Sequence, residues 1–128
     1  MAASRFSRAA FDALVRRALE AIPDPFRRRL DNVTVTVQDR PARKLLREMG
    51  CAADETIYGL YEGTPLIERD VAEPPLYPDR VTIFREPLEE DFGDDADEIV
   101  RQIRITVIHE IGHHFGLTDD DMEHMEEG

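Results

Sequence analysis

The sequence predicts an α+β fold in which a small mixed sheet of about three strands packs against a helix near each end of the chain. Apolar residues recur at helical spacing over 7–22 and over 100–115, whereas residues 33–38 alternate between apolar and polar. Two further segments, 56–61 and 80–85, are rich in the β-branched and aromatic residues that favour strands.

The N-terminal segment predicts a helix from Ser7 to Ile22. Its apolar residues are three or four positions apart and so share one face, which consists of Phe11, Leu14, Val15, Ala18, Leu19 and Ile22. Pro23 and Pro25 end the helix, because proline lacks the amide hydrogen that a helix interior requires. We expect this helix to pack on the core through its apolar face.

The middle of the chain predicts two strands separated by a short helix. The first strand, 33–38, is typical of a sheet with one buried face, because its valines alternate with polar residues. Pro41 then opens the short helix, which Gly50 ends. The second strand covers Thr56–Tyr61 and stops at Gly63.

The third strand is predicted at Arg80–Arg85, and Pro87 closes it. We expect this strand to lie along the edge of a cleft, where an extended peptide could pair with it. The acidic run Glu89–Glu98 then predicts a loop that leads into a helix, with Asp94 or Asp95 as the N-cap.

Two predictions compete for the last element, because β-branched side chains dominate residues 103–108 and by themselves favour a strand. The longer pattern favours a helix, since an apolar stripe follows a rotation of about 100° per residue through Val100, Ile103, Val107, Ile111 and Phe115. The other side is polar and carries Gln102, Thr106, His109, Glu110 and His113. We therefore expect a central helix whose polar side faces a cleft.

This polar side contains an HExxH motif formed by His109, Glu110 and His113. The two histidines are four residues apart, which places them about 40° apart in azimuth and about 6 Å apart along the axis. Both imidazoles can therefore bind one zinc ion, for which neutral histidine is a preferred ligand. Glu110 is turned by about 100° from His109, so its carboxylate can act on zinc-activated water as a general base.

Two imidazoles do not complete a tetrahedral zinc site, so the rest of the chain must supply a further ligand. Gly116 can adopt positive φ just past the helix and reverse the chain. This reversal would return Asp119 toward the metal as the third ligand, and Asp120 is the alternative. The fourth position would then be left for water.

The charge of the chain, −12 in total, is divided unevenly. Residues 1–49 carry +5, from 11 basic and 6 acidic side chains, and residues 50–128 carry −17, from 5 basic and 22 acidic. The acidic half favours cations and repels nucleic acid. No apolar run is long enough to span a membrane or to act as a secretory signal. We therefore expect a cytoplasmic monomer with one domain over 1–128, which acts on a peptide or protein substrate and binds neither nucleic acid nor membrane.

The run HEIGHHFGLTDD resembles the HExxHxxGxxD form of the zincin motif, with Asp119 where most metzincins have a third histidine. Together with NVTVTV, YGLYEGTPL and RVTIF, it is similar to a family of small bacterial zincin-like metallopeptidase domains over about Pro23 to Asp121. The resemblance implies a minimal zincin fold, with a small mixed sheet packed against helices. It also implies that His109, His113 and Asp119 bind zinc and that Glu110 is the catalytic base.

The main functional hypothesis is hydrolysis of peptide bonds by a zinc-activated water, with Glu110 as the general base. The alternative is a catalytically inactive zinc-stabilised binding module, because only nine residues follow Asp119, where metzincins continue into a further subdomain. Tyr58 or Tyr61 could assist the oxyanion, but the sequence favours core packing for both tyrosines.

Overall fold

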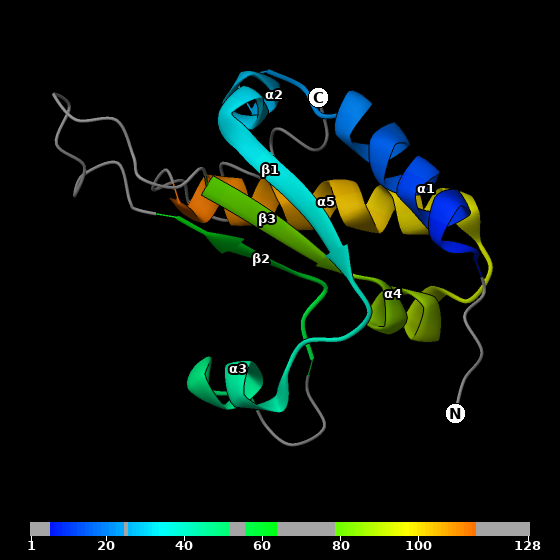
Figure 1. Cartoon of the computed structure of the whole chain (residues 1–128). Helices are drawn as coiled ribbons and strands as arrows, with labels where there is room; N and C mark the ends of the chain where they lie inside the picture. Colours follow the sequence, from blue (N-terminus) through cyan, green and yellow to red (C-terminus); the bar gives the residue numbers. More distant parts are fainter. Residues whose placement is uncertain (1–5, 25, 52–55, 64–78, 115–128) are drawn as a thin grey trace, which may run out of the picture.

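A three-stranded sheet and a long helix across one of its faces form the centre of the fold (Figure 1). The structure is a computed structural model that describes residues 6–24, 26–51, 56–63 and 79–114. Strand β1 (Val33–Gln38) is parallel to β3 (Asp79–Phe84), and β2 (Gly59–Glu62) is antiparallel to β3. The sheet is therefore mixed, with the order β1-β3-β2, and the expected small α+β fold is confirmed.

The two faces of this sheet differ in character. The valines of β1 lie opposite Asp79, Val81 and Ile83 of β3, and alternation along a strand places all of these residues on one face. Val81 and Ile83 are fully buried in the core, so this is the face that the helices cover. The opposite face carries Thr36 and Thr82, whose hydroxyl oxygens lie 3.3 Å apart.

The expectation that the strand at 80–85 lies at the edge of a cleft was wrong. β3 pairs with β1 on one side and with β2 on the other, so it is the central strand. The physical reason is burial, because all residues of β3 except Arg80 are buried, as a strand with neighbours on both sides requires. The strand beside the motif helix is β2, which begins only at Gly59 rather than at Thr56.

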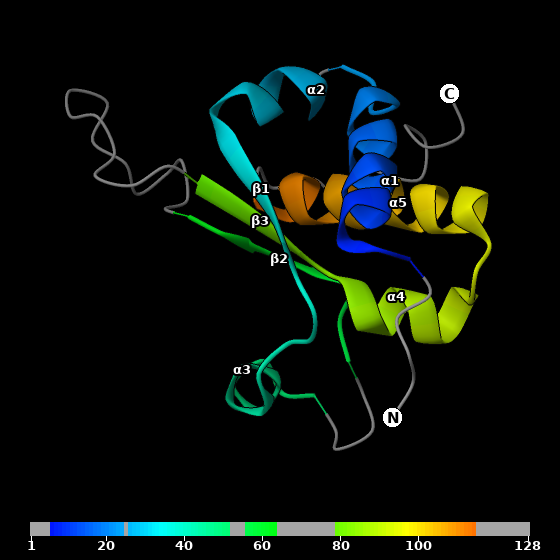
Figure 2. The same cartoon turned by 45° about the vertical axis from the view of Figure 1, so that its right-hand side comes forward.

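Helix α1 (Arg8–Glu20) packs against the long helix α5 (Ala96–His114), and the two cross in Figure 2. The Ser7 hydroxyl accepts a hydrogen bond from the backbone N–H of Ala10 at 3.1 Å, which satisfies an amide that the first turn leaves without a helical partner. The predicted apolar face is the buried one. The short α2 (Phe26–Arg29) and the 3-10 turn η1 (Leu30–Asn32) then lead into β1.

Helix α3 (Arg43–Glu48) lies apart from the sheet in both views (Figures 1 and 2). Gly50 ends it as expected, with a φ of 79° that favours glycine. The N–H of Gly50 donates to the carbonyl of Arg47, and the N–H of Cys51 donates to that of Leu46, both at 3.0 Å. These two bonds form a Schellman motif that satisfies the last carbonyls of the helix.

The expected loop after β3 was wrong, because a helix, α4 (Arg85–Phe92), follows the strand directly. Pro87 does not prevent it, since this proline is the third residue of the helix. The first-turn amides of a helix have no intrahelical partner, so a missing N–H there costs no hydrogen bond. Leu88 is fully buried in the core and fixes the helix to it.

Helix α5 provides the largest share of the core. Asp95 is its N-cap, because the Asp95 carboxylate accepts from the N–H of Glu98 at 3.1 Å and its carbonyl accepts from Ile99. The fully or almost fully buried residues of the helix are Ile99, Ile103, Val107, Ile108 and Ile111. The β-branched segment at 103–108 is therefore helical, as the longer periodicity predicts.

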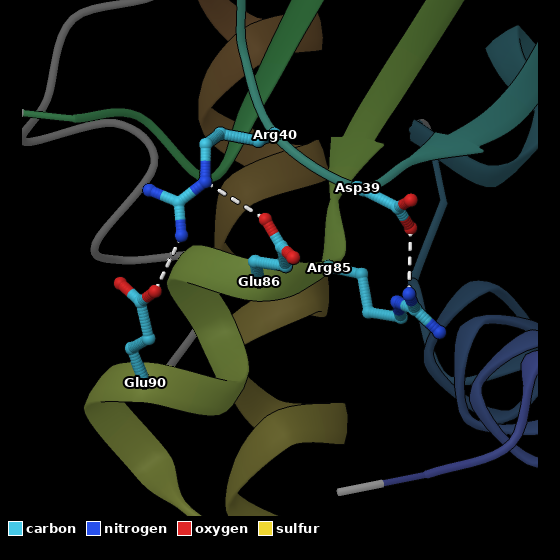
Figure 3. Close-up of polar contacts among 5 residues, drawn as sticks. All are labelled: Asp39, Arg40, Arg85, Glu86 and Glu90. Carbon is cyan, nitrogen blue, oxygen red and sulfur yellow. Dashed lines mark hydrogen bonds and ion pairs between the residues drawn. The ribbon is translucent and has the colours of Figure 1, made fainter. Parts of the chain in front are cut away.

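Ion pairs join the end of β1 to the start of α4 (Figure 3). Arg85 donates to the Asp39 carboxylate at 2.6 Å, and the N–H of Glu86 donates to the Asp39 carbonyl at 2.8 Å. Arg40 donates to Glu86 at 2.8 Å and to Glu90 at 2.5 Å, and these hydrogen bonds raise the pKa of its guanidinium. The two residues that follow β1, Asp39 and Arg40, are therefore both bonded to the first turns of α4.

Candidate metal centre

The HExxH residues lie in the last turns of α5 that the structure describes. His109 and Glu110 are half-buried, whereas His113 is exposed. This end of the helix, drawn in orange, lies behind the sheet where β2 ends and β3 begins (Figure 1). Because α5 packs against β2, the motif is placed next to the backbone of that strand.

The His109 ring is oriented by its own helix. Its Nδ1 atom lies 2.9 Å from the carbonyl oxygen of Ile105, one turn earlier. A carbonyl can only accept a hydrogen bond, so the neutral ring that makes this contact carries its proton on Nδ1. The lone pair is then on Nε2, and this tautomer is the one required for a metal ligand bound through Nε2.

The two imidazoles are close enough to share one ion after a small adjustment. Their ring centroids are 6.1 Å apart and the ring planes are inclined at 68°. Two histidines that bind one tetrahedral zinc at about 2.0 Å have ring centroids roughly 5 Å apart, so the rings must approach by about 1 Å. His113 is exposed and can supply this movement by rotating its side chain. The donor pair therefore fits zinc.

Glu110 is oriented by β2 rather than by its own helix. Its carboxylate accepts a hydrogen bond from the backbone N–H of Tyr61 at 3.3 Å. Burial raises the pKa of the Glu110 carboxyl, while the Tyr61 N–H and the charges of His113 and His109 act in the opposite direction. A carboxylate with a raised pKa is a stronger base than an ordinary surface glutamate.

The tyrosines of this region are packing residues, as the sequence favours. Tyr58 packs against Phe92, with ring centroids 5.8 Å apart, and its hydroxyl donates to Asp91. The Tyr61 hydroxyl donates to the buried Asp79 at 2.6 Å, while its ring packs against the core. Tyr61 is thus held at its side chain by β3 and contacts Glu110 through its backbone.

The contact that brings β2 to the motif helix was not predicted from the sequence. A Cβ atom placed on Gly59 would lie 2.8 Å from Cγ2 of Thr106, which is the residue one turn before Glu110. Only glycine can approach the helix so closely. A glycine inside a strand segment often marks a close approach of the backbone to a neighbour, so Gly59 itself was the available signal.

The predicted third ligand falls outside the part of the chain that the structure describes, as do Gly116, Asp119 and Asp120. Within the described ranges, no three histidine, cysteine or acidic side chains come together as a metal-binding group. None of the helices in these ranges has the length and apolarity that a membrane span requires.

Comparison with known proteins relates this chain to one family. A search of curated proteins found no match for the chain. The family model described as zincin-like metallopeptidase, by contrast, matches residues 30–128, which include all three strands, α4, α5 and the HExxH motif. The chain therefore belongs to the zincin-like metallopeptidase family.

Proposed function

We propose that the protein is a zinc-dependent peptidase in which His109, His113 and Asp119 hold the metal and Glu110 is the general base. Membership of the zincin-like family implies zinc binding and a peptidase-like function. The observation that carries the proposal is that His109 and Glu110 are each oriented for a different task, by Ile105 and Tyr61 respectively.

The two histidines are the part of the ligand set that α5 supplies. The bond from Nδ1 of His109 to the Ile105 carbonyl fixes the ring and directs Nε2 outward from the helix. When bound, zinc supplies Lewis-acid activation of water and of the scissile carbonyl. Asp119 completes the site in this proposal, and Asp120 remains the alternative ligand.

Glu110 receives the proton from the attacking water and later transfers it to the leaving amine. Its half-buried carboxylate supports this role, because burial raises its pKa and so makes it a stronger base than an exposed glutamate. The Tyr61 N–H holds the carboxylate in one orientation at 3.3 Å. This preorganisation reduces the motion that proton transfer requires.

The substrate in this proposal is an extended peptide that lies beside β2. Among the described strands, β2 pairs with β3 alone, so it has one edge that no described strand covers. The N–H of Tyr61 donates to Glu110, so this amide is not available to the peptide, which would pair with the other main-chain groups of the edge. An extended peptide that pairs with an edge strand is held mainly by main-chain hydrogen bonds, which place its carbonyls next to Glu110.

The proposal is tested with Glu110→Gln and His109→Ala, compared with the wild type in zinc binding and in hydrolysis of a broad peptide library. We expect Glu110→Gln to bind zinc as the wild type does and to lose at least about a hundredfold in kcat, because the amide cannot accept the proton. His109→Ala should lose both zinc and hydrolysis.

Hydrolysis that survives Glu110→Gln would refute the assigned base. Zinc that stays bound with wild-type affinity in His109→Ala would refute the assigned ligands. If the wild type binds zinc but hydrolyses no peptide in the library, the peptidase hypothesis is rejected in favour of a zinc-stabilised binding module.

A further inference from the structure

We propose that Gly59 is a positioning residue for the general base, because its missing side chain lets β2 lie close enough to α5 for the Tyr61 N–H to hold Glu110. This inference rests on the proposed role of Glu110. It concerns β2 and α5 only, and it does not depend on the identity of the third zinc ligand.

The contact at Gly59 leaves no room for a side chain. A Cβ atom would lie 2.8 Å from Cγ2 of Thr106 and 3.1 Å from the carbonyl oxygen of Thr82. Carbon atoms pack at about 3.5–4.0 Å, so the first contact is too short by roughly 1 Å. The Thr82 oxygen belongs to the backbone of the central strand and cannot rotate away. The strain would therefore separate β2 from α5.

Thr106 is also fixed in its orientation. Its hydroxyl donates to the carbonyl of Gln102 at 2.8 Å, one turn earlier in α5. This bond restricts the rotation of the side chain, so Cγ2 stays directed at Gly59. At this contact, one methyl group and one glycine thus limit how closely β2 can approach α5.

The Gly59 contact and the Tyr61 hydrogen bond both depend on the distance between β2 and α5. Gly59 and Tyr61 are two residues apart and so lie on the same face of β2, while Thr106 and Glu110 are one turn apart on α5. The distance from the Tyr61 nitrogen to the Glu110 carboxylate is already 3.3 Å, near the upper limit for such a bond. A separation of about 1 Å would break it.

The histidines are independent of this contact, because both come from α5. A small displacement of β2 changes the orientation of Glu110 relative to the peptide but leaves the spacing of His109 and His113 unchanged. Gly59→Ala should therefore affect proton transfer and spare zinc binding. A variant that merely unfolds the protein would lose both.

The first experiment is independent of activity and follows the Tyr61 backbone N–H by NMR in the full chain. We expect Gly59→Ala to shift this amide proton upfield, as Glu110→Ala does, because both changes remove the hydrogen bond. Thr106→Ser added to Gly59→Ala deletes the obstructing methyl group and keeps the hydroxyl, so it should return the signal toward its wild-type position.

A matched control is Leu60→Ala. Leu60 lies in β2 between the two contact residues, and alternation directs its side chain to the sheet face opposite α5. This variant weakens the packing of the strand without inserting an atom between β2 and α5. The Tyr61 amide signal should stay at its wild-type position.

The second experiment measures zinc affinity and hydrolysis in the same variants. Gly59→Ala should lower kcat by about tenfold to a hundredfold, as expected when a catalytic group is misplaced by about 1 Å, with zinc affinity unchanged. The double variant should recover most of this loss. The double variant relieves the clash in either case, so the zinc affinity makes the distinction: it falls together with hydrolysis if Gly59 serves stability alone, and it stays unchanged if only Glu110 is misplaced.

The inference is overturned if folded Gly59→Ala retains the wild-type Tyr61 signal, or if the double variant stays as far shifted as the single one. If Gly59→Ala does not fold, Thr106→Ile decides the question, because it enlarges the same contact from the helix and should shift the same signal. A wild type without hydrolysis would reject the proposed function, whereas the Tyr61 signal would still decide the contact.

Discussion

His109 and Glu110 are neighbours in α5, yet they are oriented by partners from different elements. The His109 ring depends on the carbonyl of Ile105 in the same helix, so its orientation is determined by local sequence alone. The Glu110 carboxylate depends on the N–H of Tyr61, which is 49 positions away along the chain. In the proposed function, metal binding and orientation of the base can therefore be separated by mutation, although the two residues are adjacent.

The tautomer of His109 is a testable consequence of the Ile105 contact. We expect the neutral ring to carry its proton on Nδ1 before zinc is added, because only a donor nitrogen can bond the carbonyl. Long-range ¹⁵N NMR spectra of the zinc-free protein distinguish the two tautomers. After zinc is added, the Nε2 resonance should show the larger shift. A proton found on Nε2 of the zinc-free ring would contradict the assignment.

Tyr58 should titrate far above an ordinary tyrosine. Burial, which is the largest cause, acts together with the hydrogen bond to Asp91 and the charge of that carboxylate to raise the Tyr58 pKa from 10.0 to about 12. Because the folded state holds this proton more tightly than the unfolded state, the resulting stabilisation is fully present below about pH 10. It is lost as the pH rises from about 10 to about 12.

Ultraviolet absorbance measures the titration of the tyrosines as the pH rises. The step that is absent in Tyr58→Phe belongs to Tyr58 and gives its pKa. Asp91→Asn should lower the Tyr58 pKa, because the negative charge is removed and the hydrogen bond to a neutral acceptor is weaker. The value should stay above 10, since burial is the largest cause. An unchanged titration in Asp91→Asn would show that the Asp91 contact has no effect on the phenol.

At the scale of elements, the helices and strands that could be predicted are those with a regular apolar pattern over several consecutive residues. The helix at 7–22 and the strand at 33–38 have a continuous period, and Gly50 provides a clear helix end. Helix α4 was missed because Pro87 is read as a breaker unless its place in the first turn is known. The central place of β3 was missed because strand order depends on pairing between distant segments.

The ion pairs between β1 and α4 should contribute unequally to stability. Arg85 is 13% exposed and pairs with Asp39, and its Nε atom is buried with no hydrogen-bond partner among the described residues. Asp39→Ala leaves this guanidinium without its carboxylate in a poorly hydrated position, so we expect a loss of about 1–3 kcal/mol in the free energy of unfolding. The Arg40 side chain is 56% exposed, so Glu90→Ala should cost less than about 1 kcal/mol.

Urea denaturation of the two variants gives the comparison directly. Each variant replaces one acidic side chain by a methyl group, and both ion pairs join the residues after β1 to α4, so each variant serves as the control for the other (Figure 3). Equal losses in the free energy of unfolding would show that the burial of Arg85 does not make its ion pair more important for stability. High salt should reduce the effect of Glu90→Ala more than that of Asp39→Ala, because exposed pairs are screened more strongly.

At the scale of the whole molecule, α5 belongs to both the core and the candidate site. Ile103, Val107 and Ile111 bury one side of the helix, and the HExxH residues occupy another. This double use is why the motif could be recognised in the sequence as a candidate site, since the polar residues of a helix with a broad apolar face are confined to one narrow side. The contact with Tyr61 and Gly59 could not be predicted, because it depends on how closely β2 packs on α5.

Zinc should therefore stabilise the whole fold and not only the site. An ion that binds only the folded state adds about 2.7 kcal/mol at a hundredfold excess over its Kd. For a domain of this size we expect a rise in Tm of roughly 10 °C. A chelator should reverse the rise, which calorimetry measures with and without zinc.

The net charge of −12 makes the histidine variants the decisive control, because an acidic protein attracts any divalent cation. Nonspecific binding should be similar for magnesium and zinc and should persist in His109→Ala and His113→Ala. Binding by the motif should be specific for zinc and should disappear in both variants, since each imidazole supplies one of the ligand nitrogens. If zinc raises the Tm of the wild type and of His109→Ala equally, the stabilisation comes from the acidic surface. The assignment of the α5 histidines as zinc ligands would then be wrong.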